Sequence, residues 1–108
     1  SKVVEDGVIL STIHGVKGME FNNVYIINCN EEVIPHKSSM EENIEEERRL
    51  FYVGITRAIN NLYVFSPKTM RGKFREASRF IAESHLEEES EKVDYGILLC
   101  TMFKKLIY

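Results

Sequence analysis

Two segments of this 108-residue chain carry side chains suited to binding phosphate. In the first, which reads STIHGVKGMEF, Thr12 supplies a hydroxyl, His14 an imidazole and Lys17 an ammonium group. These groups are common partners of phosphate oxygens. Gly18 would let the backbone approach a ligand closely, and the carboxylate of Glu20 suits hydrogen bonds from sugar hydroxyls. The alternative is a turn whose glycines serve backbone geometry and whose polar groups face water.

The second segment reads EEERRLFYVGITRA, and its Arg57 has no acid within four positions on either side. An arginine near a helix end either complements the helix macrodipole or acts as an arginine finger. In that second role, its planar cation neutralises the charge developing on a transferred γ-phosphoryl group. Arg48 and Arg49 are most simply ion-pair partners of the preceding glutamates.

Other chemistries find less support in the sequence. The histidines at positions 14, 36 and 85 are far apart, and neither cysteine has a partner at metal-ligand spacing, so we expect no metal site. The chain has no Gly-x-Ser-x-Gly elbow for acyl transfer. It also has no Gly-x-x-x-x-Gly-Lys-Ser/Thr loop, the element that cradles phosphates in P-loop ATPases.

Composition favours an ordinary globular domain, with 44% hydrophobic and 29% charged residues and a formal net charge of −3. The apolar runs are too short to span a bilayer, no signal-peptide pattern is visible, and two cysteines cannot build a disulfide framework. We therefore expect a cytoplasmic setting. Residues 57–79 carry six bases and one acid. This basic block is interpreted either as a solvated face or as a phosphate-facing surface.

The elements that position these residues follow from the apolar pattern. Runs at residues 8–10, 24–27 and 62–65 predict three strands buried on both faces, as in a parallel sheet. A helical face runs from residue 44 to residue 58, and a second helix is expected over about residues 74–84. The order of these elements predicts an α/β fold with about three parallel strands flanked by helices. Residues 87–91 resemble a polar linker, and the apolar residues beyond them suit a docking helix or strand.

Together and in this order, the two segments resemble motifs V and VI of the UvrD/PcrA/Rep helicases, superfamily 1 DNA translocases. The first is similar to the usual form T-L-H-x-x-K-G-L-E-F, and EERRLFYVGITRA is similar to motif VI almost letter for letter. The resemblance covers about residues 7–84. It implies a partial RecA-like fold of the P-loop NTPase type. Residues 1–84 would be the C-terminal part of the second RecA-like lobe, and residues 85–108 an acidic linker and tail.

For nucleotide binding, the resemblance implies roles for three residues. Arg57 matches the motif VI arginine that contacts the γ-phosphate, and Glu20 matches the glutamate that contacts the nucleotide ribose. Gly18 would be the close-approach glycine between the ATP and DNA sites. ATP with Mg²⁺ would be bound mainly by the other lobe, which brings the phosphate loop. We therefore expect an ATP-dependent DNA helicase when the protein is intact, and no activity from this chain alone.

For DNA binding, Thr12 and His14 match positions near the single-stranded DNA backbone, and Lys17 lies on the route between the DNA and ATP sites. The expected partners are single-stranded or partly duplex DNA and the remaining lobes in the same polypeptide, with no membrane. The alternative is a non-catalytic module, derived from a helicase, that binds nucleic acid or a protein. A phosphate loop encoded upstream in the same reading frame would decide between the two.

Overall fold

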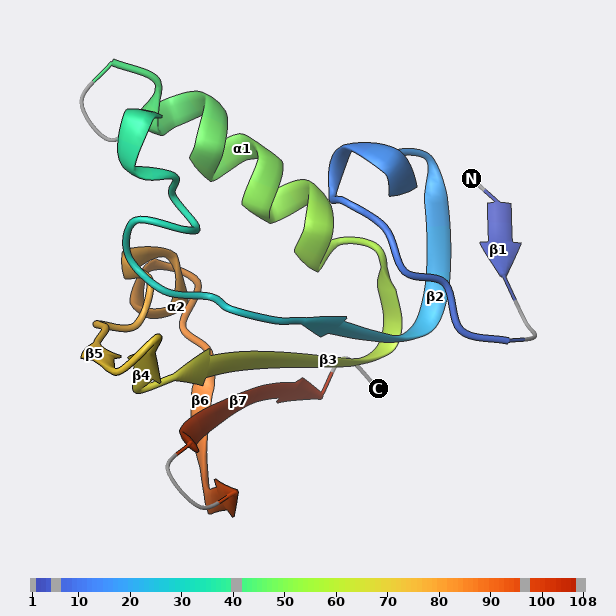
Figure 1. Ribbon diagram of the computed structural model, residues 1–108. Coiled ribbons are helices and arrows are strands. Elements are labelled where there is room, and N and C mark those ends of the chain that lie inside the picture. Colours follow the sequence, from blue (N-terminus) through green and yellow to red (C-terminus); the bar gives the residue numbers. More distant parts are fainter. Residues whose placement is uncertain (1, 5–6, 40–41, 96–97, 107–108) are drawn as a thin grey trace.

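Runs of β-branched and aromatic residues form the strands of one mixed sheet in the computed structural model, which describes residues 2–4, 7–39, 42–95 and 98–106 (Figure 1). The elements in chain order are β1 (Lys2–Val4), the 3-10 helix η1 (His14–Val16), β2 (Met19–Ile26), the 3-10 helix η2 (Lys37–Ser39), α1 (Ile44–Ile55), β3 (Ala58–Pro67), β4 (Thr69–Met70), β5 (Lys73–Phe74), α2 (Arg79–Glu83), β6 (Glu87–Tyr95) and β7 (Leu98–Leu106). The fold is therefore α/β, as the sequence predicts.

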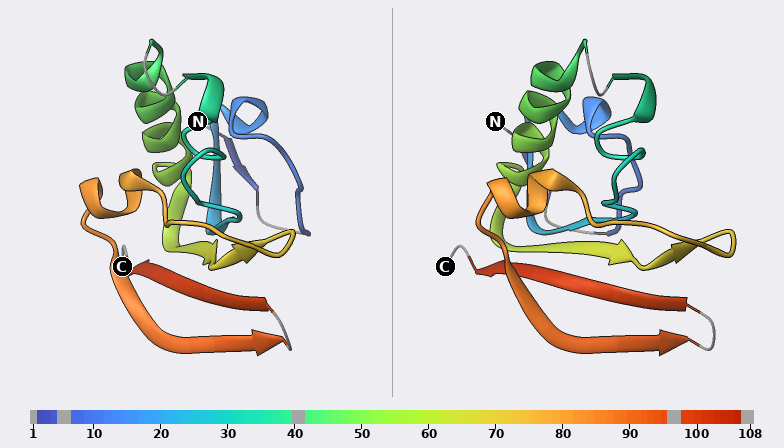
Figure 2. Two further views of the ribbon diagram at one scale, coloured as in Figure 1. Left: turned by 60° about the vertical axis from the view of Figure 1, so that its left-hand side comes forward. Right: turned by 90° about the vertical axis from the view of Figure 1, so that its left-hand side faces the viewer.

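The described strands of the main sheet lie in the order β1-β2-β3-β7-β6. β1, β2 and β3 are parallel to one another, and α1 connects β2 to β3. β7 is antiparallel to β3, and β6 is antiparallel to β7. Figure 2 shows α1 on one side of β3 and the β6–β7 hairpin extending the sheet beyond it. The prediction of about three strands is thus too low, because this hairpin adds two.

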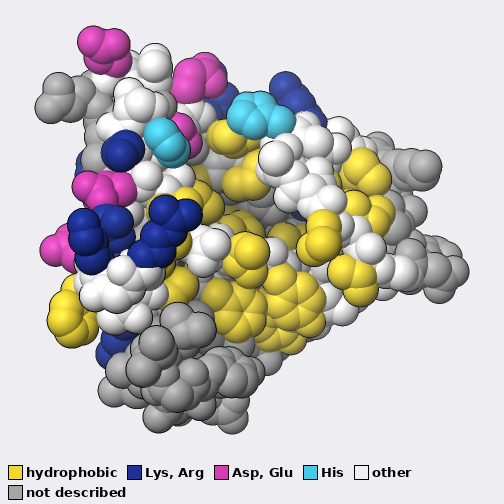
Figure 3. Space-filling view, in the orientation of Figure 1, with side chains coloured by type: hydrophobic (Ala, Val, Ile, Leu, Met, Phe, Trp, Pro, Cys, Tyr) yellow, Lys and Arg dark blue, Asp and Glu magenta, His cyan; other side chains and the backbone are white. Residues whose placement is uncertain are grey.

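The core lies between the sheet and α1. Alternate residues of β3 point into it, so that Leu62 and Val64 are fully buried while their neighbours are only half-buried. Phe51 of α1 and Phe80 of α2 complete this core, with ring centroids 5.4 Å apart. On the opposite face of the sheet, Tyr25 stacks on Tyr63 at 4.9 Å. The apolar side chains on that face are visible in Figure 3.

Three predicted elements differ from the structure. Residues 8–10 form no strand: Val8 and Leu10 are 91% and 93% exposed, and β1 takes the expected place beside β2. A short apolar run does not reveal which segment finds a pairing partner, and here residues 2–4 pair with Met19–Phe21. Residues 87–91, predicted to be a polar linker, lie within β6 instead.

The second helix is much shorter than the predicted span of residues 74–84. The preceding residues form the β4–β5 hairpin, whose turn residues Arg71 and Gly72 both have positive φ, 52° and 77°. A two-residue turn with positive φ at both residues matches the right-handed twist of the two strands that it joins. α2 begins only at Arg79, where the Ser78 side chain accepts a hydrogen bond from the backbone N–H of Phe80 at 3.2 Å.

Candidate nucleotide and nucleic-acid site

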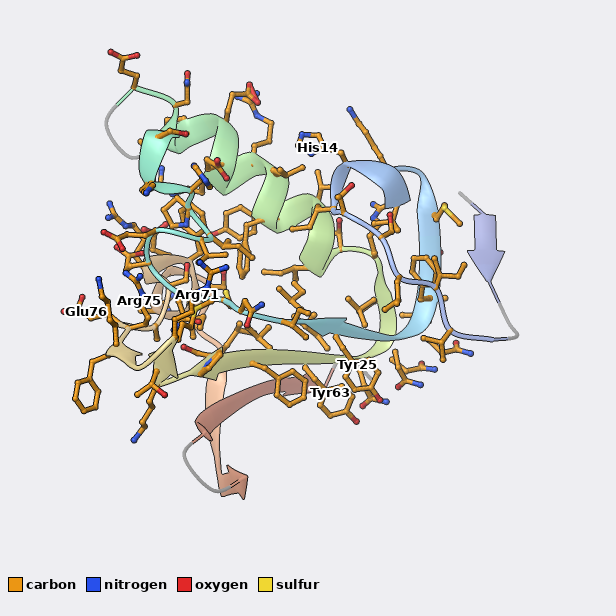
Figure 4. The ribbon with its side chains drawn as sticks, in the orientation of Figure 1. His14, Tyr25, Tyr63, Arg71, Arg75 and Glu76 are labelled. Atoms are coloured by element: carbon orange, nitrogen blue, oxygen red, sulfur yellow. The ribbon has the colours of Figure 1, made fainter. Side chains whose placement is uncertain are left out.

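The STIHGVKGMEF segment forms an exposed turn followed by the start of β2. The turn closes through a hydrogen bond from the backbone N–H of Gly15 to the Thr12 carbonyl at 3.1 Å, and the same N–H lies 3.2 Å from the Thr12 hydroxyl. Thr12, His14 and Lys17 are all exposed. Figure 4 shows His14 projecting from η1 beside α1. The three predicted DNA contacts therefore belong to one small exposed unit.

Gly18 joins this turn to β2 with a φ of +84°, a conformation that side-chain-bearing residues rarely adopt. Within the described part of the chain, and apart from Gly18 and its two chain neighbours, no heavy atom lies within 4 Å of the position that a Cβ would take. The glycine is therefore required by the backbone conformation. Close approach to a ligand at Gly18 stays a prediction.

Arg57 brings the two segments together at the end of α1. Its guanidinium donates from Nη1 to the Met19 carbonyl at 3.1 Å, and from Nε to the Val53 carbonyl at 3.1 Å. Its Nη2 lies 3.2 Å from the Thr56 hydroxyl. The backbone carbonyl of Arg57 also accepts a hydrogen bond from the N–H of Phe21 at 2.8 Å. Arg57 thus fastens the last turn of α1 to the first residues of β2.

This geometry bears on both roles that the sequence offers for Arg57. The bond to the Val53 carbonyl satisfies a backbone group at the helix C-terminus, which is the structural role. The hydrogen bonds seen among the described residues occupy three of the five N–H donors of a guanidinium. The side chain is only half-buried. The arrangement is therefore compatible with a further anionic partner.

Glu20 lies one residue after Met19, whose carbonyl Arg57 holds. It is half-buried in β2, and its neighbour Phe21 pairs with Ala58, the residue after Arg57. Glu20 and Arg57, two of the three residues expected at the nucleotide site, therefore lie near the starts of adjacent parallel strands, although 37 positions separate them in the sequence.

A groove of about 390 Å³ separates the exposed turn from α1. His14 and Lys17 line one side together with Ile13. The other side comes from the N-terminal loop and outer face of α1, with the lining residues Asn43, Glu46, Glu47, Arg49, Leu50 and Val53. The structure thus brings His14 and Lys17 into one groove, whereas Arg57 and Glu20 lie where α1 ends and β2 begins.

The glutamate-rich start of α1 pairs with its arginines, as the sequence predicts. Arg48 bonds Glu45 on the helix and also Glu83 of α2 at 2.6 Å, while Arg49 pairs with Glu46. The hydrogen bond from Arg48 lowers the pKa of Glu83 below its ordinary value. The Arg48 guanidinium also lies 5.6 Å from the centroid of the Phe80 ring. These contacts hold α1 against α2.

Part of the basic block at residues 57–79 serves the fold. Arg79 binds Glu31 at 2.6 Å and Arg75 pairs with Glu32, so both neutralise the acidic loop after β2. Arg71 and Lys73 are exposed on the β4–β5 hairpin. Figures 3 and 4 show basic side chains gathered at this end of the molecule. The block is therefore divided between internal ion pairs and an exposed hairpin.

The contacts that sequence reasoning missed are backbone groups. The carbonyls of Met19 and Val53 position Arg57, and no residue type signals a carbonyl in advance. Across the described residues, no three His, Cys, Asp or Glu side chains are placed to share a metal ion. No helix in that same part of the chain is long and apolar enough to cross a membrane.

Comparison with known proteins gives a consistent result. The model of the family described as UvrD-like helicase C-terminal domain matches residues 1–69. Among similar proteins, ATP-dependent DNA helicase PcrA of Bacillus subtilis is 46% identical over 85 residues, covering 73% of this chain and 12% of that protein. ATP-dependent DNA helicase Rep of Escherichia coli is 48% identical over 83 residues, covering 72% of this chain and 12% of that protein. Rep of Buchnera aphidicola subsp. Schizaphis graminum is 39% identical over 112 residues, covering 98% of this chain and 17% of that protein. The chain spans only 12% to 17% of the length of these relatives.

Proposed function

Because the chain belongs to the UvrD-like helicase C-terminal domain family, we propose that it is the C-terminal part of the second RecA-like lobe of an ATP-dependent DNA helicase. The observation that carries this proposal is the contact between the two motif segments. Arg57, at the end of one segment, donates to the carbonyl of Met19 in the other. Residues 1–84 would supply this part of the lobe, and the other lobes would lie in the same polypeptide.

On the nucleotide side, Arg57 is the proposed arginine finger and Glu20 the proposed ribose contact. The remaining N–H donors of the Arg57 guanidinium suit the oxygens of a γ-phosphoryl group, because a planar fork matches phosphate geometry. The carboxylate of Glu20 suits the ribose hydroxyls, and Gly18 lies two residues before it. The Mg²⁺ that accompanies ATP would neutralise phosphate charge, held mainly by the lobe that carries the phosphate loop.

On the DNA side, Thr12, His14 and Lys17 are the proposed contacts to the backbone of single-stranded DNA. Their exposure on one turn supports this role, because each side chain is accessible without any rearrangement of the core. Contacts of this kind make binding tolerant of sequence and sensitive to salt.

The proposed mechanism is ATP-gated stepping. Closure of the two lobes on ATP would bring Arg57 to the γ-phosphate, where its charge stabilises the transition state. Hydrolysis and release would reopen the lobes. The turn that carries Thr12, His14 and Lys17 would then shift along the DNA because it shares a hydrogen-bonded junction with Arg57.

Replacing the finger tests this proposal. In the intact protein, we expect Arg57→Ala to lower kcat for ATP by about 10³-fold, as for other arginine fingers. Arg71→Ala is the matched control, because Arg71 is an exposed arginine on the β4–β5 hairpin, outside the lining of the groove. Near-normal turnover of Arg57→Ala would contradict the assignment.

A segment exchange tests whether this chain can serve in a helicase. In Rep of Escherichia coli, the matching 83-residue segment would be replaced by that of this chain. We expect the hybrid to retain DNA-dependent ATP hydrolysis, and to lose it when Arg57→Ala is added. A folded hybrid whose hydrolysis is unaffected by Arg57→Ala would exclude the finger role.

A further inference from the structure

Ile13 and Gly54 make a second contact between the exposed turn and α1, separate from the hydrogen bond of Arg57. A Cβ placed on Gly54 would lie 3.4 Å from both Cδ1 and Cγ2 of Ile13 and 3.6 Å from its Cγ1. Gly54 is buried and Ile13 is half-buried. The Ile13 side chain therefore faces Gly54 in the last turn of α1.

The backbone conformation does not explain a glycine at this position. Gly54 lies inside α1, and the described glycines with positive φ are Gly7, Gly18 and Gly72. Glycine is also among the least favourable residues for a helix interior. A Cβ at position 54 would be in ordinary van der Waals contact with Ile13, and a longer side chain would extend into the space that Ile13 fills. Ile13 therefore restricts position 54 to a small residue.

The turn of helix under Ile13 is the one that holds Arg57. The Val53 carbonyl accepts from Nε of Arg57 at 3.1 Å, and the Gly54 carbonyl accepts from its backbone N–H at 3.2 Å. Val53 lines the groove beside Ile13. At the other end of the exposed turn, the Met19 carbonyl accepts from Nη1 of Arg57. The exposed turn therefore lies against the surroundings of Arg57 at both ends of the turn, at Ile13 and at Met19.

We propose that Ile13 and Gly54 are positioning residues that couple DNA binding on the exposed turn to the placement of the Arg57 guanidinium. Ile13 lies between Thr12 and His14, so a displacement of the backbone of this turn on binding DNA moves Ile13 as well. Close-packed groups transmit such displacements, because the interior has little free space. The last turn of α1, with the two carbonyls that hold Arg57, then moves with Ile13. This inference rests on the proposed function of Arg57 and of the turn.

The test uses the full-length helicase and measures ATP hydrolysis with and without a single-stranded oligo-dT. Ile13→Ala removes the contact, and Gly54→Leu forces Ile13 away. We expect each to lower the stimulation by DNA by roughly 2- to 30-fold, the range for residues that carry coupling between sites. The stimulated rate should fall by more than the basal rate, because the coupling acts only when DNA is bound.

Two further variants make the result specific. Val16→Ala removes a similar half-buried side chain from the same turn, outside the lining of the groove, and should leave the stimulation unchanged. In the double variant Ile13→Ala with Gly54→Leu, the leucine on α1 fills the volume that is lost at position 13. This variant should recover part of the stimulation. Should Gly54→Leu fail to fold, Ile13→Ala and the double variant still decide the question.

The outcomes separate this inference from the proposed function. Unchanged stimulation in Ile13→Ala, or an equal loss of basal and stimulated rates, overturns the coupling role while the finger assignment stands. Normal hydrolysis in Arg57→Ala overturns the proposed function itself.

Discussion

The two segments of the site differ in how firmly the fold holds them. α1 buries Phe51, Gly54 and Ile55, and the ion pair between Arg48 and Glu83 fastens it to α2. The η1 turn buries none of its residues, and its internal bonds are local. The proposed finger therefore follows a rigid helix, whereas the proposed DNA contacts lie on a turn that meets that helix at a few points.

This difference suits the two tasks. A group that stabilises a transition state must be held in place before the reaction occurs, which favours a packed helix. Contacts to a DNA backbone of any sequence tolerate, and benefit from, a surface that adapts. The contrast predicts that mutations in the helix will mainly affect stability, and mutations in the turn will mainly affect DNA binding.

The largest effect is expected in the packed segment. Phe51 is 1% exposed and contacts Phe80. Phe51→Ala should lower the free energy of unfolding by about 3–5 kcal/mol, since it leaves a large cavity in the core. Thermal or urea unfolding of the chain measures this. A loss below about 1 kcal/mol would mean that α1 is not the rigid partner described above.

The joint between the two segments should be the next most sensitive position. Gly18→Ala places a Cβ on a residue with φ of +84°, so the backbone is strained although no described atom is in the way. We expect a loss of about 1–2 kcal/mol in unfolding free energy. Gly15→Ala is the comparison, because Gly15 has no positive φ and the nearest atoms to its added Cβ belong to the side chains of Ser11, whose hydroxyl must move, and Thr12. Equal effects would argue against backbone strain at Gly18.

In the turn, Lys17→Ala should weaken DNA binding without changing stability. The side chain is exposed, so its loss removes no packing. In the full-length protein, the slope of log Kd for oligo-dT against log salt concentration should decrease by about one, which corresponds to one counterion fewer released on binding. The Kd at low salt should be several-fold higher. Lys37→Ala, at an exposed lysine on η2, is the control. An unchanged salt slope would remove Lys17 from the DNA interface.

The smallest effect concerns the ion pair that fastens α1 to α2. Since Arg48 lowers the pKa of Glu83, the pair stabilises the fold above the ordinary carboxyl pKa and loses this contribution as pH falls through the lowered value. Unfolding temperatures at neutral and at acid pH should therefore differ less in Glu83→Gln than in the wild type. Glu45→Gln, which leaves the bond from Arg48 to Glu83 intact, should retain more of the pH dependence.

Sequence patterns predicted the elements around the site better than the tail of the chain. The face running from Ile44 defined α1, and the apolar runs at residues 24–27 and 62–65 marked β2 and β3. These elements have strong local patterns and a long-range partner in the core. Residues 8–10 have an equally apolar pattern and no pairing partner, and pairing is decided by the rest of the sheet.

The sequence by itself determined the residue types of the site and their order, because motif spacing is written in the chain. It named Thr12, His14 and Lys17 as candidates for DNA, and Glu20 and Arg57 as candidates for nucleotide. Only the tertiary structure decided that Arg57 reaches the carbonyl of Met19 and that Ile13 rests on Gly54. These pairs of residues lie about forty positions apart in the chain, and the hydrogen bond of Arg57 is accepted by a backbone carbonyl. Side-chain chemistry can be read from sequence, whereas the backbone groups that hold it become visible only when the chain is folded.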